Sequence, residues 1–178
     1  LENRLRIVVA GSDSALNAVI TRLMRADNLW AEVAFIPTGE SAAAANWGLP
    51  GAPQEALELA RTAPVRPVPL IRNDSGQAVA GSATISDWSN GPLTGEIIID
   101  DATLAASGRG TFGARLVPMT DAPGILAARA TSPVEPEGRL RSLLRKPGRL
   151  DPDSVRTGRA VQAGGPQLRV LVDAIPHK

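Results

Sequence analysis

Hydrophobic positions at the start of the chain follow the spacing of a strand and then of a helix. Residues 4–10, RLRIVVA, are a short apolar run ending before Gly11, which predicts a buried strand. Apolar residues then recur at intervals of three and four, as on a helix packed against a sheet: Leu16, Val19, Ile20, Leu23 and Met24. Three polar residues before this stripe can cap the helix: Ser12, Asp13 and Ser14.

The next residues repeat the alternation of strand and helix. Residues 31–37, AEVAFIP, predict a second strand, and the alanine-rich residues 41–47 predict a short helix. Pro53 is placed to open a third helix through about residue 62. Strand, helix, strand and helix in this order predict a parallel sheet covered by helices.

The pattern changes after residue 63. Short alternating or β-branched runs, separated by Gly, Pro, Asn and Asp, predict an antiparallel sandwich or barrel: residues 66–72, 77–86, 95–101, 111–118, 124–131 and 167–173. One helix is expected at residues 137–145. We therefore predict two domains, an α/β domain over residues 1–64 and an all-β domain over residues 65–178.

Composition narrows the class of protein. The net charge is +1 and aromatic residues make up 3% of the chain, so nucleic acid is not an expected partner. The chain has no cysteine and no apolar run long enough to cross a membrane, and we expect a cytoplasmic protein. The lone histidine, His177, has no evident partners for a catalytic triad.

Positive charge is concentrated near the C-terminus. Seven basic residues lie between positions 139 and 159, namely Arg139, Arg141, Arg145, Lys146, Arg149, Arg156 and Arg159. Only Asp151 and Asp153 oppose them there. A solvated helix and loop is one interpretation, and contact with an anionic membrane surface, which would place the protein peripherally at a membrane, is the other.

The stretch VVAGSDSALNAVI, residues 8–20, joins the first strand to the first helix. Glycine-rich turns in this position bind phosphate because their backbone N–H groups converge and no side chain blocks the approach. Here Gly11 is followed by Ser12 and Ser14, which restrict that approach. Taken alone, the turn is more typical of a capped helix that binds no ligand.

The order of motifs along the chain resembles the diacylglycerol kinase-like lipid kinases, a family that includes sphingosine kinases and, more distantly, NAD kinases. The family's Gly-Gly-Asp-Gly-Thr turn, followed by Leu-Asn-Glu, matches Gly11–Ala18, including Asp13 and Asn17. Its Pro-x-Gly-Thr-Gly-Asn-Asp turn and Leu-Gly-Ile-Pro segment match residues 36–50, IPTGESAAAANWGLP.

The resemblance implies a parallel-sheet domain of the NAD kinase and diacylglycerol kinase type, without its first strand-helix unit, followed by an antiparallel β-sandwich. It also implies ATP and magnesium as cofactors. The implied nucleotide-binding residues are Gly11, Ser12, Asp13, Ser14, Asn17, Gly39, Glu40 and Ser41.

Several family features are changed in this chain. Two glycines and the threonine of the first turn are replaced, and Glu40 stands at the threonine of the second, where a carboxylate repels phosphate unless a metal bridges them. Ala42 and Ala43 replace the Asn-Asp pair. In the β-rich part, Asp121 lies near the family's Asp-Gly position, and Asp173 begins the segment matching its Asp-Gly-Glu motif. We assign no catalytic base and no metal ligands.

These changes predict a lipid-kinase-like binding or regulatory protein with little or no catalysis. The alternative is a divergent, active ATP-dependent kinase that phosphorylates a lipid hydroxyl. A third hypothesis places a lipid or another small molecule in a cleft between the two domains. A missing sheet strand would leave an exposed edge, which favours a homodimer.

Overall fold

The computed structural model describes residues 5–86, 93–108, 111–121, 124–136, 150–151, 154–162 and 169–174. The chain divides into two compact units. Unit 1 comprises Leu1–Ser82 and Val117–Ala122, and unit 2 comprises Ala83–Leu116 and Pro123–Lys178. The domain boundary expected at residues 64–65 stays a prediction.

Unit 1 is built on a two-stranded parallel sheet. β1 (Arg6–Gly11) pairs with β2 (Glu32–Pro37) in a register that runs from Arg6 opposite Glu32 to Gly11 opposite Pro37. The strands are joined by α1 (Asp13–Arg25), whose apolar stripe buries Leu16 and Ile20. The two strands and the first helix therefore form as the hydrophobic spacing predicts.

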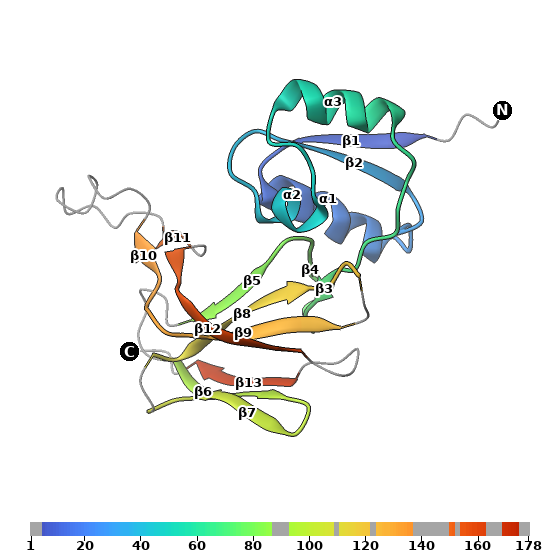
Figure 1. Ribbon diagram of the computed structural model, residues 1–178. Helices are drawn as coiled ribbons and strands as arrows, with labels where there is room; N and C mark the ends of the chain where they lie inside the picture. The colour runs from blue at the N-terminus through green and yellow to red at the C-terminus, as the bar shows by residue number, and fades with distance from the viewer. Residues whose placement is uncertain are drawn as a thin grey trace. The chain divides into compact units, whose positions relative to one another are not determined.

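Two further helices complete the α/β part of unit 1. The short helix α2 (Ala42–Trp47) ends at Gly48, whose φ of 66° is the left-handed conformation that glycine adopts most readily. The third helix, α3 (Pro53–Thr62), begins with proline at its first turn, as the sequence predicts. Figure 1 shows α3 on one side of the β1–β2 sheet and α1 with α2 on the other.

The core of unit 1 joins the sheet to α1, α2 and a short hairpin. The hairpin consists of β3 (Ile71–Arg72) and β4 (Ala78–Val79), which pair in antiparallel fashion. The buried cluster comprises Val9, Leu16, Ile20, Phe35, Ala43, Ala44, Ala78 and Ala80. Four of its members are alanines, so the helices and the hairpin approach each other closely.

Unit 2 contains antiparallel sheets. Its four-stranded sheet has the order β12-β9-β8-β5, formed by β12 (Thr157–Gln162), β9 (Ile125–Ala130), β8 (Gly113–Pro118) and β5 (Ala83–Ser86). The last two residues of β8 belong to unit 1. A three-stranded sheet has the order β13-β6-β7, formed by β13 (Arg169–Ala174), β6 (Leu93–Ile99) and β7 (Ala102–Ala106). A two-stranded sheet pairs β10 (Glu135–Pro136) with β11 (Leu150–Asp151).

The predicted fold class, a parallel sheet of the NAD kinase and diacylglycerol kinase type followed by an antiparallel β-sandwich, is wrong. In the described residues the parallel sheet stops at two strands, and the other sheets are small and antiparallel. The expected strand at residues 66–72 forms only at its end, as β3. Pro64, Pro67 and Pro69 precede it, and proline has no N–H to donate to a ladder. The chain therefore passes the sheet without joining it.

Candidate functional site

The carboxylate of Asp13 lies at the N-terminus of α2. It accepts hydrogen bonds from the hydroxyl of Ser41 and, at 3.1 Å, from the backbone N–H of Ala43. The Ser41 hydroxyl oxygen also accepts from the N–H of Ala44 at 2.9 Å, as an N-cap does. Asp13 and Ser41, predicted from separate motifs, are thus brought together, and their shared role is to cap α2.

The other residues of the first turn have local or structural partners. Ser12 caps α1 by accepting from the N–H of Ala15 at 3.4 Å. Asn17 Oδ1 accepts from the N–H of Ala80 at 2.9 Å and so ties α1 to the end of the β3–β4 hairpin. Ser14 is exposed on α1. At Gly11, an added Cβ would lie 3.2 Å from the Cβ of Ala15.

The second turn stays open. Gly39 and Glu40 are exposed, and a Cβ added at Gly39 would meet no atom within 4 Å. The described residues therefore leave the space around Gly39 open and do not enclose a ligand there. Unlike Asp13 and Ser41, Gly39 and Glu40 are not drawn into the capping network.

The turn after β1 and the turn after β2 do not fit a nucleoside triphosphate with magnesium. A phosphate is held at a helix N-terminus by free backbone N–H groups, and at α2 the carboxylate of Asp13 already accepts from one of them. A phosphate there would face that carboxylate at close range, with Glu40 adding a second negative charge nearby in the sequence. Among the described residues, no group of three His, Cys, Asp or Glu side chains could hold a metal ion.

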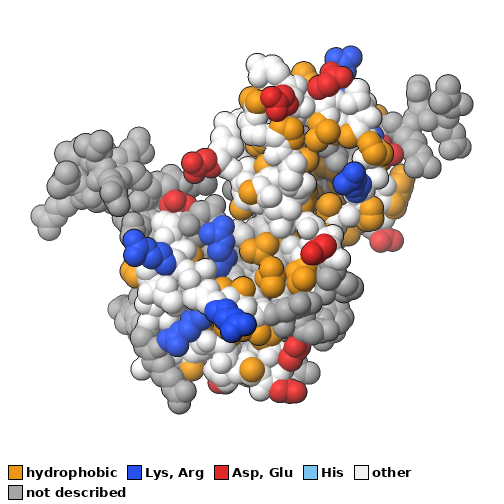
Figure 2. Space-filling model, in the orientation of Figure 1, with side chains coloured by type: hydrophobic (Ala, Val, Ile, Leu, Met, Phe, Trp, Pro, Cys, Tyr) orange, Lys and Arg blue, Asp and Glu red, His pale blue; other side chains and the backbone are white. Residues whose placement is uncertain are grey.

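Other sequence candidates are only partly described. Asp121 is exposed, while Asp173 lies on β13 and its side chain is not described. Of the seven basic residues, Arg156 and Arg159 are described, and both are exposed. The other five, the expected helix at residues 137–145 and His177 lie outside the described residues. Figure 2 shows Lys and Arg side chains gathered on the face of unit 2 that it draws.

Unit 1 contains an apolar pocket of about 810 Å³ that lies entirely among its own residues. We call it the open-edge pocket, because Val33, Ala34 and Phe35 all line it. Residues of α1 and of α3 also line it, and these helices lie on opposite sides of the sheet, so the pocket reaches around the edge of β2. That edge is the one not paired with β1, and no described strand pairs with it.

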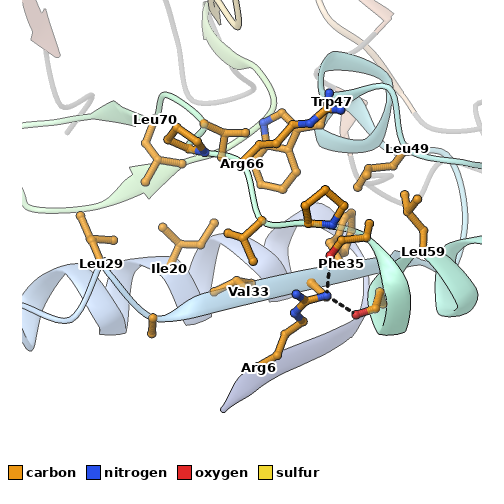
Figure 3. A pocket seen from close by; sticks show the side chains of 18 of the residues that line it. Arg6, Ile20, Leu29, Val33, Phe35, Trp47, Leu49, Leu59, Arg66 and Leu70 are labelled. Atoms are coloured by element: carbon orange, nitrogen blue, oxygen red, sulfur yellow. Dashed lines mark hydrogen bonds between the residues drawn. The ribbon is translucent and has the colours of Figure 1, made fainter. Parts of the chain in front are cut away.

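Helices and an extended segment form the rest of the pocket wall. α1 contributes Ile20 and Leu23, α3 contributes Leu59, and residues 63–68 and Leu70 run along the pocket. Figure 3 shows Ile20 and Val33 directed toward the side of the pocket where Arg66 and Leu70 lie. The proline-rich segment that fails to join the sheet thus lines the space that a third strand would occupy.

The pocket is also lined by apolar side chains that water reaches. Five large hydrophobic residues that line it are exposed: Leu29, Trp30, Leu59, Val65 and Val68. Trp30 is 81% exposed. Single exposed apolar residues are ordinary, but a group of them around one cavity is typical of a binding surface. On the face of unit 1 drawn in Figure 2, hydrophobic side chains cover more of the surface than charged ones.

The sequence analysis did not predict this pocket, because most of its residues lie in segments expected to form the packed strands and helices of the α/β domain. The signal was the spacing of Pro64, Pro67 and Pro69, which prevents the expected strand from pairing. Trp47 also lines the pocket, and its Nε1 is buried with no hydrogen-bond partner among the described residues.

Within the described residues, no helix has both the length and the apolar character needed to cross a bilayer. Comparisons of this chain with protein-family models, with curated proteins and with solved structures found no match.

Proposed function

We propose that this chain is a non-catalytic binding protein that takes an apolar small molecule in the open-edge pocket of unit 1. The pocket carries the proposal. Its volume of about 810 Å³ lies within the range of small-molecule sites, and its wall is largely apolar with a few polar groups. Filling it would remove exposed leucine, valine and tryptophan surface from water, which favours binding.

The turns that resemble nucleotide loops act as structural joints in this proposal. Asp13 and Ser41 cap α2, and Asn17 holds the β3–β4 hairpin against α1. Catalysis of phosphoryl transfer depends on positioned groups that neutralise the charge of the phosphates. The first turn instead commits its acidic and amide side chains to the protein's own backbone, which supports a binding role over a kinase.

Binding of the uncharged dye Nile red, followed by its fluorescence, tests the pocket. Leu57 and Leu59 are both exposed leucines on α3, but only Leu59 lines the pocket. We expect Leu59→Gln to weaken dye binding about fivefold, because part of a leucine's burial is lost, while Leu57→Gln leaves it unchanged. Equal effects of the two substitutions would contradict the assignment of the pocket.

Thermal unfolding with magnesium-ATP tests the absence of kinase function. A ligand that binds only the folded state stabilises it by RT ln(1 + [L]/Kd), so the unfolding temperature rises with ligand concentration. We expect no shift at millimolar nucleotide. A concentration-dependent rise, together with phosphate transfer to a diacylglycerol or sphingoid base, would overturn the non-catalytic assignment in favour of a divergent kinase.

A further inference from the structure

We infer that the ligand of the open-edge pocket is an anionic single-chain amphiphile, such as a fatty acid, whose head group binds Arg66. The inference rests on the proposed function and adds the charge and shape of the ligand. The two charged residues among the described residues lining the pocket are Arg6 and Arg66, and no carboxylate lines it.

Arg6 is already committed within the protein. Its Nη1 donates to the carbonyl oxygens of Ala60 at 2.6 Å and Ala63 at 3.1 Å, as the dashed lines of Figure 3 show. Its Nε pairs with Glu32 at 3.2 Å. These contacts fix the end of α3 and neutralise the guanidinium. Arg6 therefore forms part of the pocket wall and does not serve as the binding group for a ligand's head group.

Arg66 has no such commitment. It is exposed, and it has no hydrogen-bond or ion-pair partner among the described residues. The neighbouring Pro64 and Pro67 restrict the backbone that carries it, because each fixes its own φ and limits the residue before it. A guanidinium donates two parallel hydrogen bonds to a carboxylate, and this fork is stronger than a bond between neutral groups.

The pocket is elongated, and this shape suits an alkyl chain. In Figure 3 the wall extends from Leu29 at one end to Leu59 at the other, with Arg66 between them. All three residues line the same pocket, and both leucines are exposed. An alkyl chain lying along this wall would cover both ends while its head group stays at Arg66.

The test compares head groups on one chain length, using dodecanoate, dodecanol and dodecyltrimethylammonium below their micellar concentrations. Competition with Nile red gives each affinity. We expect dodecanoate to bind about tenfold more tightly than dodecanol, from one charge-assisted contact at an exposed arginine, and the cationic amphiphile to bind most weakly. Decanoate should bind about tenfold more weakly than dodecanoate, because it buries two fewer methylene groups.

Two arginine variants then locate the head group. Arg66→Gln should remove the preference for dodecanoate over dodecanol and leave dodecanol affinity unchanged. Arg72→Gln is the matched control, because Arg72 is also exposed, carries the same charge and does not line the pocket. Since both side chains are exposed, neither change is expected to unfold the protein, and circular dichroism of each variant checks this.

The outcomes separate the inference from the function on which it rests. Equal affinity for dodecanoate and dodecanol, or equal loss of the preference in both arginine variants, overturns the anionic ligand while the apolar pocket stands. Failure of all three amphiphiles and of Nile red overturns both. A preference for dodecanoate that disappears only in Arg66→Gln supports the inference.

Discussion

Replacing Asp13 by alanine should destabilise unit 1, although Asp13 stands in a turn that resembles a nucleotide loop. The substitution removes the acceptor for the Ser41 hydroxyl and for the N–H of Ala43, both partly buried at the start of α2. The Ser41 hydroxyl still caps Ala44, so the helix keeps one of its caps. The expected loss is therefore that of the carboxylate's two bonds and not of the whole helix.

The magnitude follows from the geometry. A hydrogen bond to a charged group contributes about 1.5–3 kcal/mol, and the partial exposure of this site favours the lower value for each of the two bonds. Alanine gains roughly 0.5 kcal/mol of helix propensity at the first position of α1. It loses a similar amount of interaction between the carboxylate and the helix dipole. We expect a net loss of about 2–3 kcal/mol, and about 1 kcal/mol for Asp13→Asn, which keeps one acceptor.

The assay is urea unfolding followed by tryptophan fluorescence in a Trp88→Phe background. Of the three tryptophans in the chain, Trp30 and Trp47 then remain, and both belong to unit 1. A double-mutant cycle of Asp13→Ala with Ser41→Ala should give a coupling of about 1 kcal/mol or more, since the two side chains bond to each other. A loss below about 0.5 kcal/mol for Asp13→Ala, with an unchanged urea dependence, would refute the capping role.

Further substitutions test the remaining joints. Asn17→Ala should cost about 1–2 kcal/mol, measured by the same urea assay, because a backbone N–H loses its acceptor. Gly81→Ala should cost about 2 kcal/mol or more, since its Cβ would lie 2.4 Å from the backbone nitrogen of Ala43. Gly39→Ala, with open space around its Cβ, should stay within about 0.5 kcal/mol of the unchanged protein; a large loss there would contradict an open second turn. Arg6→Gln should cost about 1–2 kcal/mol and speed hydrogen exchange at the end of α3, where its two carbonyl contacts lie.

Local patterns predicted β1, β2 and the three helices of unit 1 because each of these elements carries its own signal. The apolar stripe of α1 and the proline that opens α3 mark helices without any knowledge of the fold. The turn between β6 and β7 carries such a local signal as well, since it is formed by Asp100 and Asp101, with Asp100 at a φ of 51°. Such features depend on neighbours in the sequence, which the sequence shows directly.

The arrangement of the elements could not be predicted in the same way. The number of strands in the parallel sheet depends on whether residues 64–70 pair with β2, and alternation of apolar residues favoured a strand there, while three prolines prevented it. β12 was missed, because its residues, TGRAVQ, begin in the segment treated as a polar, basic connection. Its pairing with β9 is a contact between distant residues, which no short window contains.

The candidate site shows the same division. Sequence motifs brought attention to Asp13, Asn17 and Ser41, but only the structure shows that their polar atoms bond to the protein itself. The open-edge pocket has no motif, since its wall combines ordinary hydrophobic residues from β2, α1 and α3 with the proline-rich segment. Only Arg66, a basic residue between prolines, could have been selected from the sequence. Its proposed role as an anion-binding group depends on the apolar pocket that it lines, and the sequence does not show that pocket.

Binding of an apolar ligand at the open edge of β2 can be located residue by residue in an NMR titration. Dodecanoate would be added to ¹⁵N-labelled protein while the backbone amide resonances are followed. We expect saturable shifts at Val33–Phe35, at Leu59 and at the residues of the 63–70 segment that are not proline, with little change in unit 2. Shifts that are absent, or that gather in unit 2 while the β2 edge stays unchanged, would contradict binding at this edge.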